Sequence, residues 1–190
     1  RLWVGPRQAV GLRTESYDMT NLKYESTIAV DRTELDDDQT GMIKPRIRDM
    51  AVRAMNFHDN LCMKTLSAGL TTSGYDGVYY FHSQHASGDS GNQSNYLIQT
   101  CVTGTIPTVA EMQGSLTSSI TKIAQYKDDK GEFISVDAMS GLLVLANPAD
   151  AFKWRTVLNA GIISQTDNVW KGTADLITTP WVPQTKWHLM

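Results

Sequence analysis

Two histidines and two aspartates in one short segment are the residues whose types and spacing best suit metal chemistry. His82 and His85 are separated by two residues, and Asp76 and Asp89 flank them. Imidazole and carboxylate groups at such spacing are ligands for zinc and other divalent ions. The segment is rich in Gly, Ser, Asn, Asp and aromatics, however, which indicates an ordered loop. We therefore favour loop histidines that hydrogen-bond to the backbone, and we predict no metal site.

Three consecutive carboxylates, Asp36, Asp37 and Asp38, suggest calcium as a second possibility. The ligand spacing of an EF-hand and its distal glutamate are missing, so a solvated acidic turn is favoured. The chain also lacks a nucleophile elbow, a P-loop and a dinucleotide-binding glycine motif. His58 lies on an apolar helical stripe, where a packed, hydrogen-bonded histidine is favoured over a catalytic base. We expect no catalytic residue and no cofactor, and hence no enzyme.

The aspartates end an arm, residues 21–40, whose side chains alternate as in a β-strand. One side of this arm carries Tyr24, Ser26, Ile28 and Val30, and the other carries Glu25, Thr27, Ala29 and Asp31. Such an arm has little core of its own. We predict that its partner lies on another copy of the chain, and that the acidic turn contacts basic residues of that neighbour.

One long amphipathic helix is expected from Ile43 to Gly69. Pro45 suits its first turn, where a missing backbone donor costs nothing. Apolar positions recur at intervals of three or four and form a stripe. Its members are Ile47, Met50, Ala51, Ala54, His58, Leu61 and Thr65.

The rest of the sequence predicts a mixed α+β region. An ordered loop covers residues 73–95, and a capping box of Thr108 and Glu111 begins a second helix that ends near residue 127. Strands are expected at 133–136, 142–145 and 168–181, and a third helix at 147–159. The segment 142–145 is apolar enough to be a central strand.

Composition excludes several classes of protein. The chain has 190 residues, 41% of them hydrophobic, which is enough for a sizeable core. A net charge of -3 and a pI near 5.8 give no general attraction to nucleic acid or to an anionic membrane. No apolar run approaches transmembrane length. Cys62 and Cys101 are expected to be free thiols and small buried hydrophobes.

Four stretches carry a resemblance to a known family. They are residues 22–32 (LKYESTIAVDR), 37–41 (DDQTG), Tyr75-Asp76-Gly77 with Phe81 and His85, and 168–176 (NVWKGTADL). Together they resemble the major head subunit of Mu-like bacteriophages, the T protein family, which has the Hong Kong 97 capsid fold. Relative to that family the chain is expected to be truncated at both ends, and it has no initiator methionine.

The resemblance implies an α+β fold with four parts. Residues 1–20 would be the remnant of an N-terminal arm, and 21–42 the β-hairpin arm called the E-loop. Residues 43–107 would hold the spine helix with the loop and strands of the peripheral domain. Residues 108–190 would form the α/β axial domain and return strands.

The resemblance also implies a structural, self-assembling protein. Copies would form the hexamers and pentamers of an icosahedral shell around double-stranded DNA, with weak, non-specific DNA contact on the inner face. Portal, scaffold and decoration proteins would be further partners, and no membrane is involved. The subunit would be made in the bacterial host cytoplasm and end in the virion capsid. The residues expected at the contact between subunits are Tyr24, Glu25, Ile28, Val30, Asp31, Arg32, Asp36, Asp37 and Asp38.

Three alternatives stay open at this point. An encapsulin-like nanocompartment shell would share the fold and enclose cargo enzymes instead of DNA. A metal-dependent hydrolase would use His82 and His85 and bind stoichiometric metal. A DNA-binding module would need a basic face and a strongly salt-dependent affinity.

Overall fold

The computed structural model describes residues 16–36, 41–99, 101, 106–134, 137, 140–184 and 186–190. Helices and strands are mixed in the second half of the chain, which confirms the α+β class. In chain order the described elements are α1 (Arg32–Asp36), α2 (Ile43–Ala68), α3 (Val109–Ala124), β1 (Leu142–Ala146), the 3-10 turn η1 (Pro148–Asp150), α4 (Ala151–Asn159), β2 (Ile162–Ile163), β3 (Thr166–Asp167), β4 (Ala174–Thr178) and β5 (Trp187–Leu189).

A three-stranded sheet forms the centre of the second half. Its order is β4-β1-β5, with β1 parallel to β4 and antiparallel to β5. β1 reads LLVLA, and four of its five residues are buried. It lies in the middle of the sheet, as its continuous apolar run predicts.

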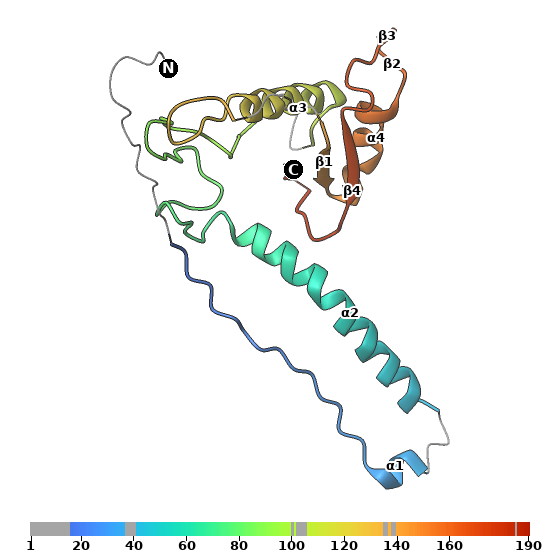
Figure 1. Cartoon of the computed structure of the whole chain (residues 1–190). Helices are drawn as coiled ribbons and strands as arrows, with labels where there is room; N and C mark the ends of the chain where they lie inside the picture. The colour runs from blue at the N-terminus through green and yellow to red at the C-terminus, as the bar shows by residue number, and fades with distance from the viewer. Residues whose placement is uncertain are drawn as a thin grey trace.

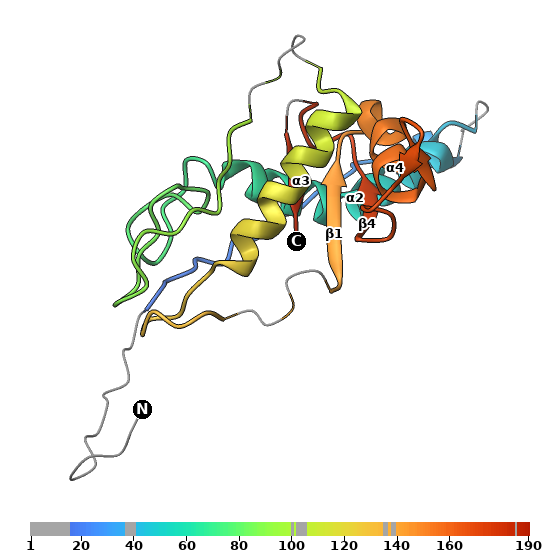
Figure 2. The ribbon, with the colours of Figure 1, turned by 90° about the horizontal axis from the view of Figure 1, so that it is seen from above.

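Helices α3 and α4 pack against one face of this sheet (Figure 2). Val144 and Ala146 are two residues apart in β1 and therefore point to the same face. The ring centroid of Trp154 lies 4.8 Å from that of Trp187 in β5, so the aromatic rings connect α4 to the edge of the sheet. The buried cluster comprises Met112, Leu116, Val144, Ala146, Trp154, Val157 and Leu158.

Local signals define both long helices. The Thr108 hydroxyl accepts a hydrogen bond from the Glu111 N–H, and the Glu111 carboxylate accepts one of 2.7 Å from the Thr108 N–H. This confirms the predicted capping box, a device that stabilises a helix by about 1 kcal/mol. The predicted first long helix is confirmed as α2, which ends at Gly69. Within the described residues, no helix combines the length and apolarity needed to cross a membrane.

Gly69 is required where α2 ends because the Phe81 side chain lies against it. A Cβ at this position would be 2.9 Å from Phe81 Cδ2, and the Phe81 N–H donates to the Gly69 carbonyl over 2.9 Å. The Phe81 ring also contacts His188 in β5, and the centroids of these two rings are 5.4 Å apart. This joint connects the end of α2 to the sheet.

The predicted ordered loop is confirmed, and it is held by a turn that follows α3. Gln93 and Lys127 exchange two hydrogen bonds: the Lys127 N–H donates to Gln93 Oε1 over 2.6 Å, and Gln93 Nε2 donates to the Lys127 carbonyl over 2.9 Å. The Asp89 N–H donates to the Asp129 carbonyl over 2.8 Å. The loop therefore has a fixed attachment to the α/β region.

Two strand predictions need correction. In the described part of 133–136, only an isolated bridge between Lys127 and Phe133 is present, and residues 135 and 136 lie outside the described residues. Within 168–181, β4 covers only Ala174–Thr178. Asn168 is buried in a turn instead, where its side-chain amide donates to the Val157 and Ala160 carbonyls at the end of α4. The last carbonyls of a helix have no donor within the helix, and Asn168 supplies one here instead of extending the strand.

Two aromatic residues of α4 provide a test of the core. Trp154 is 1% exposed and Phe152 is 78% exposed. We expect Trp154→Ala to lower the free energy of unfolding by about 3–5 kcal/mol, because it leaves a cavity between α4 and β5. Phe152→Ala should change it by less than about 0.5 kcal/mol. Chemical denaturation followed by circular dichroism measures both, and equal losses would contradict this core.

Candidate assembly surface

Residues 16–31 form a single extended segment that runs along α2 (Figure 1). This segment contains the first half of the predicted arm and is called the arm from here on. Among the described residues, no helix or strand begins before Arg32, and residues 16–30 make no hydrogen bond within the described chain. No second strand pairs with the arm among the described residues of this single chain, and the β-hairpin predicted for residues 21–42 stays a prediction. All sixteen residues are exposed. The strand-like alternation is left without a partner.

Asp31 ends the arm and begins α1. It accepts hydrogen bonds from the Thr33 hydroxyl, at 2.6 Å, and from the Thr33 N–H, at 2.8 Å. These two bonds hold the pKa of Asp31 below its ordinary value. Asp31 is thus a helix cap that stays ionised near neutral pH.

The acidic turn expected after Asp31 is only partly described. Asp36 lies in α1 and is 4.0 Å from Arg32 Nε, with both side chains largely exposed. An exposed pair of this kind contributes little to stability. Asp37 and Asp38 lie outside the described residues. The subunit-contact role predicted for Glu25, Arg32 and the aspartates stays a prediction, as do the domain boundaries after residues 20, 42 and 107.

Helix α2 has 26 residues and none of them is buried. Its one ring contact with the arm joins Phe57 to Tyr24, with centroids 4.7 Å apart. Tyr24 is still 55% exposed, so the arm covers α2 only thinly. His58 and Cys62 are exposed, which corrects the expectation that both would be packed; Cys62 and Cys101 are free thiols as predicted. The packing residues predicted for this helix have no second layer to pack against.

A second apolar side of α2 was missed in the sequence. Val52 and Met55 are 49% and 78% exposed. At 3.6 residues per turn, Met55 lies roughly 160° around the helix from Phe57. The sequence already contained the signal for this second side, because apolar residues of α2 also occur outside the single stripe that was predicted. An α-helix that is apolar on two sides normally has neighbours on both.

His82 and His85 lie near each other but do not form a metal site in this geometry. His85 Nδ1 is 2.5 Å from Asp76 Oδ2, and Nε2 is 3.1 Å from the Tyr80 carbonyl oxygen. Both ring nitrogens face oxygen atoms of the loop itself, so neither points into an open coordination position. His82 Nδ1 accepts from the Gln84 N–H. In the described residues, no group of three or more metal-ligating side chains comes together. The histidines fix the loop.

The Asp76–His85 pair should make the loop sensitive to acid. Burial raises the pKa of the Asp76 carboxyl, but hydrogen bonds from His85 and the Val78 N–H outweigh it and leave the pKa lowered. Ionised Asp76 thus stabilises the loop above the ordinary carboxyl pKa, and this contribution is lost as pH falls through the lowered value. We expect amide exchange at Val78 to accelerate, relative to the intrinsic rate, below about pH 4. Asp76→Asn should remove this pH dependence and Asp89→Asn should preserve it; a flat wild-type profile would contradict the pair.

The contact between Tyr24 and Phe57 predicts how firmly the arm is held. Aromatic pairs contribute about 0.5–1.5 kcal/mol beyond the area that they bury. Phe57→Ala should therefore increase the rate of tryptic cleavage after Lys23 roughly two- to tenfold in the monomer. Met55→Ala, on the far side of α2, is the matched control and should leave the rate unchanged. Equal rates in the two variants would show that the arm is not held by α2.

Comparison with known proteins gives relatives of one kind. The Mu-like prophage FluMu major head subunit of Haemophilus influenzae (strain ATCC 51907 / DSM 11121 / KW20 / Rd) is 30% identical over 93 residues, which are 49% of this chain and 30% of that protein. The major capsid protein of Escherichia phage Mu is 29% identical over 109 residues, 54% of this chain and 36% of that protein. The chain thus spans about a third of the length of these relatives. No solved structure matches it significantly.

The family model described as "Mu-like prophage major head subunit gpT" matches residues 1–105. This range includes the described arm, α1, α2 and the loop with Asp76 and His85. It is more than half of the 190-residue chain. Neither relative is, by its name, a nanocompartment shell or a hydrolase. The chain belongs to the family of Mu-like prophage major head subunits.

Proposed function

We propose that the protein is a major capsid subunit that assembles into an icosahedral shell of hexamers and pentamers around double-stranded DNA. The observation that carries this proposal is the exposed α2. A helix of 26 residues with two apolar sides and no buried residue has no complete structural environment within one described chain. A neighbouring copy supplies that environment. The names of the two relatives, a major head subunit and a major capsid protein, support the role of a capsid subunit.

The energetics favour covering α2 by protein. Helical stability in proteins comes mainly from packing of an apolar face, and isolated helices are marginal in water. Burying a side chain such as Val52 or Met55 contributes about 1.5–3 kcal/mol. A few such residues therefore provide a large part of the free energy that holds two subunits together, once the costs of association are subtracted.

Charge at the far end of the arm supports contact with a neighbour. Lys44 and Arg46 lie at the N-terminus of α2, where the helix dipole disfavours cations, and no acidic residue occupies the first turn. Asp31 and Asp36 are exposed nearby along the chain. A neighbouring subunit that places carboxylates beside the two cations, and cations beside the two aspartates, would neutralise both pairs and fix how the subunits align.

The proposal extends to the fold and to the other partners. It takes the arm as the E-loop, α2 as the spine helix and the sheet region as part of the axial domain of a Hong Kong 97-type subunit. Contact with packaged DNA is weak and non-specific, in keeping with the net charge of -3. Portal, scaffold and decoration proteins complete the virion, and the subunit is made in the host cytoplasm.

Negative-stain microscopy of the purified protein tests the proposal together with a variant of α2. The wild-type protein should form shells or ring-shaped capsomers. Val52→Lys with Met55→Lys should leave dispersed monomers with an unchanged unfolding temperature, because it places two charges on an apolar side that only the assembly buries. Ser118→Lys with Thr121→Lys, two exposed positions of α3, is the charge-matched control and should assemble normally. A wild-type protein that stays monomeric under all conditions would overturn the proposal.

A further inference from the structure

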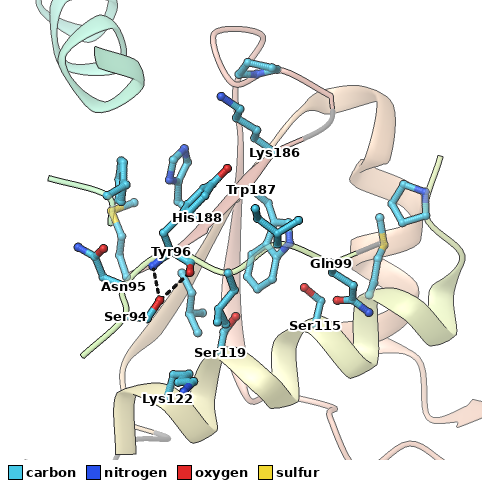
Figure 3. A pocket seen from close by; sticks show the side chains of 18 of the residues that line it. Ser94, Asn95, Tyr96, Gln99, Ser115, Ser119, Lys122, Lys186, Trp187 and His188 are labelled. Carbon is cyan, nitrogen blue, oxygen red and sulfur yellow. Dashed lines mark hydrogen bonds between the residues drawn. The ribbon is translucent and has the colours of Figure 1, made fainter. Parts of the chain in front are cut away.

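A groove of about 820 Å³ lies where the end of α2, the segment Ser94–Gln99, α3 and β5 meet. Figure 3 shows Ser115 and Ser119 on one wall, formed by α3, with Trp187 of β5 opposite them. Apolar side chains also line the groove, among them Met112 and Ile123. The space is open to solvent, and its lining contains both polar and apolar side chains.

The wall formed by β5 is an unpaired sheet edge. Leu143 and Met190 exchange two backbone hydrogen bonds, of 2.7 and 2.9 Å. Bonded and non-bonded positions alternate along an antiparallel pair, so His188 also bonds to β1. Trp187 and Leu189 therefore direct their N–H and carbonyl groups away from β1. No hydrogen-bond partner for these groups is present in the described residues.

The arm is the complementary piece of the same chain. Its residues 16–30 have extended backbone, strand-like alternation and no hydrogen bond within the described chain. In its own chain the arm lies along α2, away from β5 (Figure 1). The contact between Tyr24 and Phe57 leaves Tyr24 more than half exposed, so little is lost if the arm leaves α2. The arm that meets the groove therefore belongs to a second copy.

We infer that the groove receives the arm of a second copy, which adds to the free edge of β5 as a further strand. Backbone hydrogen bonds to Trp187 and Leu189 provide the attachment, as in other cases of strand addition. Ile28 and its neighbours on the apolar side of the arm face Ile98 and Ile123, which line the groove and are accessible. This inference rests on the proposed function, because it identifies the surface on which one subunit takes hold of the next.

Charge agrees with this occupant. Lys122 on α3 and Lys186 before β5 both line the groove, and they approach it from different elements (Figure 3). The described arm carries three acidic residues and one basic residue: Asp18, Glu25, Asp31 and Lys23. Its net charge of -2 is opposite in sign to that of the two lysines. Glu111 and Asp150 also line the groove, but Glu111 accepts hydrogen bonds from Thr108 and Asp150 is buried, so the exposed charges of the lining are the two lysines.

A synthetic peptide of residues 16–31, added to the full 190-residue chain at a concentration where that chain is monomeric, tests the inference. Hydrogen exchange is the measurement. At saturating peptide, the Trp187 and Leu189 amides should exchange at least about tenfold more slowly, because they gain hydrogen bonds. The His188 amide already bonds to β1 and is the internal control, with little change expected.

Variants on both partners sharpen the test. Ile28→Asp in the peptide should weaken binding at least tenfold, whereas Ala29→Asp, on the opposite side of the strand, should weaken it less than twofold. In the chain, Ser119→Trp fills the groove and should abolish protection, and Ser118→Trp on the exposed side of α3 should not. Absent protection with the wild-type chain, or identical effects of the two serine variants, would overturn the inference.

The outcome is separable from that of the proposed function. The peptide assay needs only the monomer and does not depend on shell formation. Shells without peptide protection would leave the function in place and refute the groove as the docking site. Peptide protection without any assembly by the wild-type chain would refute the capsid role, and the groove would still bind the arm.

Discussion

The structure depends on one constraint: α2 is apolar on two sides, and the described residues of a single chain cover only part of one. Tyr24 contacts Phe57 and leaves most of the helix in water. The arm in turn has no partner for its backbone in the described chain. Each of these two elements lacks what a folded protein normally provides, and they lie side by side. A second copy is the simplest source of both the missing packing and the missing hydrogen bonds.

The sheet region shows the opposite balance. Its core is closed around Trp154 and Leu116, and the end of α4 is satisfied by Asn168. Phe81 transmits the position of α2 to this region, since it packs on Gly69 and on His188. Burial, with a smaller effect of Lys186, lowers the pKa of His188, so a neutral imidazole stacks on the ring of Phe81. The well-packed sheet region thus fixes the C-terminal end of α2, whereas the N-terminal end of this helix is exposed to solvent.

The elements that could be predicted from the sequence are those whose signals are local. The capping box at Thr108, the apolar run of β1 and the glycine after α2 each determine structure within a few residues. The fate of the arm, His58 and Cys62 could not be read in this way, because burial depends on what packs from elsewhere. Asn168 was assigned to a strand although its partners are carbonyls of α4, more than seven residues earlier in the chain. The groove beside β5 is likewise a property of four separated segments.

The proposed contact between the arm of one copy and the groove of the next constrains the symmetry of the assembly. An arm on one subunit and a groove on the next are different surfaces, so their contact is heterologous. A heterologous contact either continues as an open filament or closes into a ring, and the rotation between neighbours decides which. The proposed hexamers and pentamers, built from one sequence, would require that rotation to take two values. In the proposed assembly, an arm that has left α2 and is attached to the three-residue edge of β5 would permit such variation. The weak contact between the arm and α2 within one chain would therefore suit the proposed shell, which contains both hexamers and pentamers.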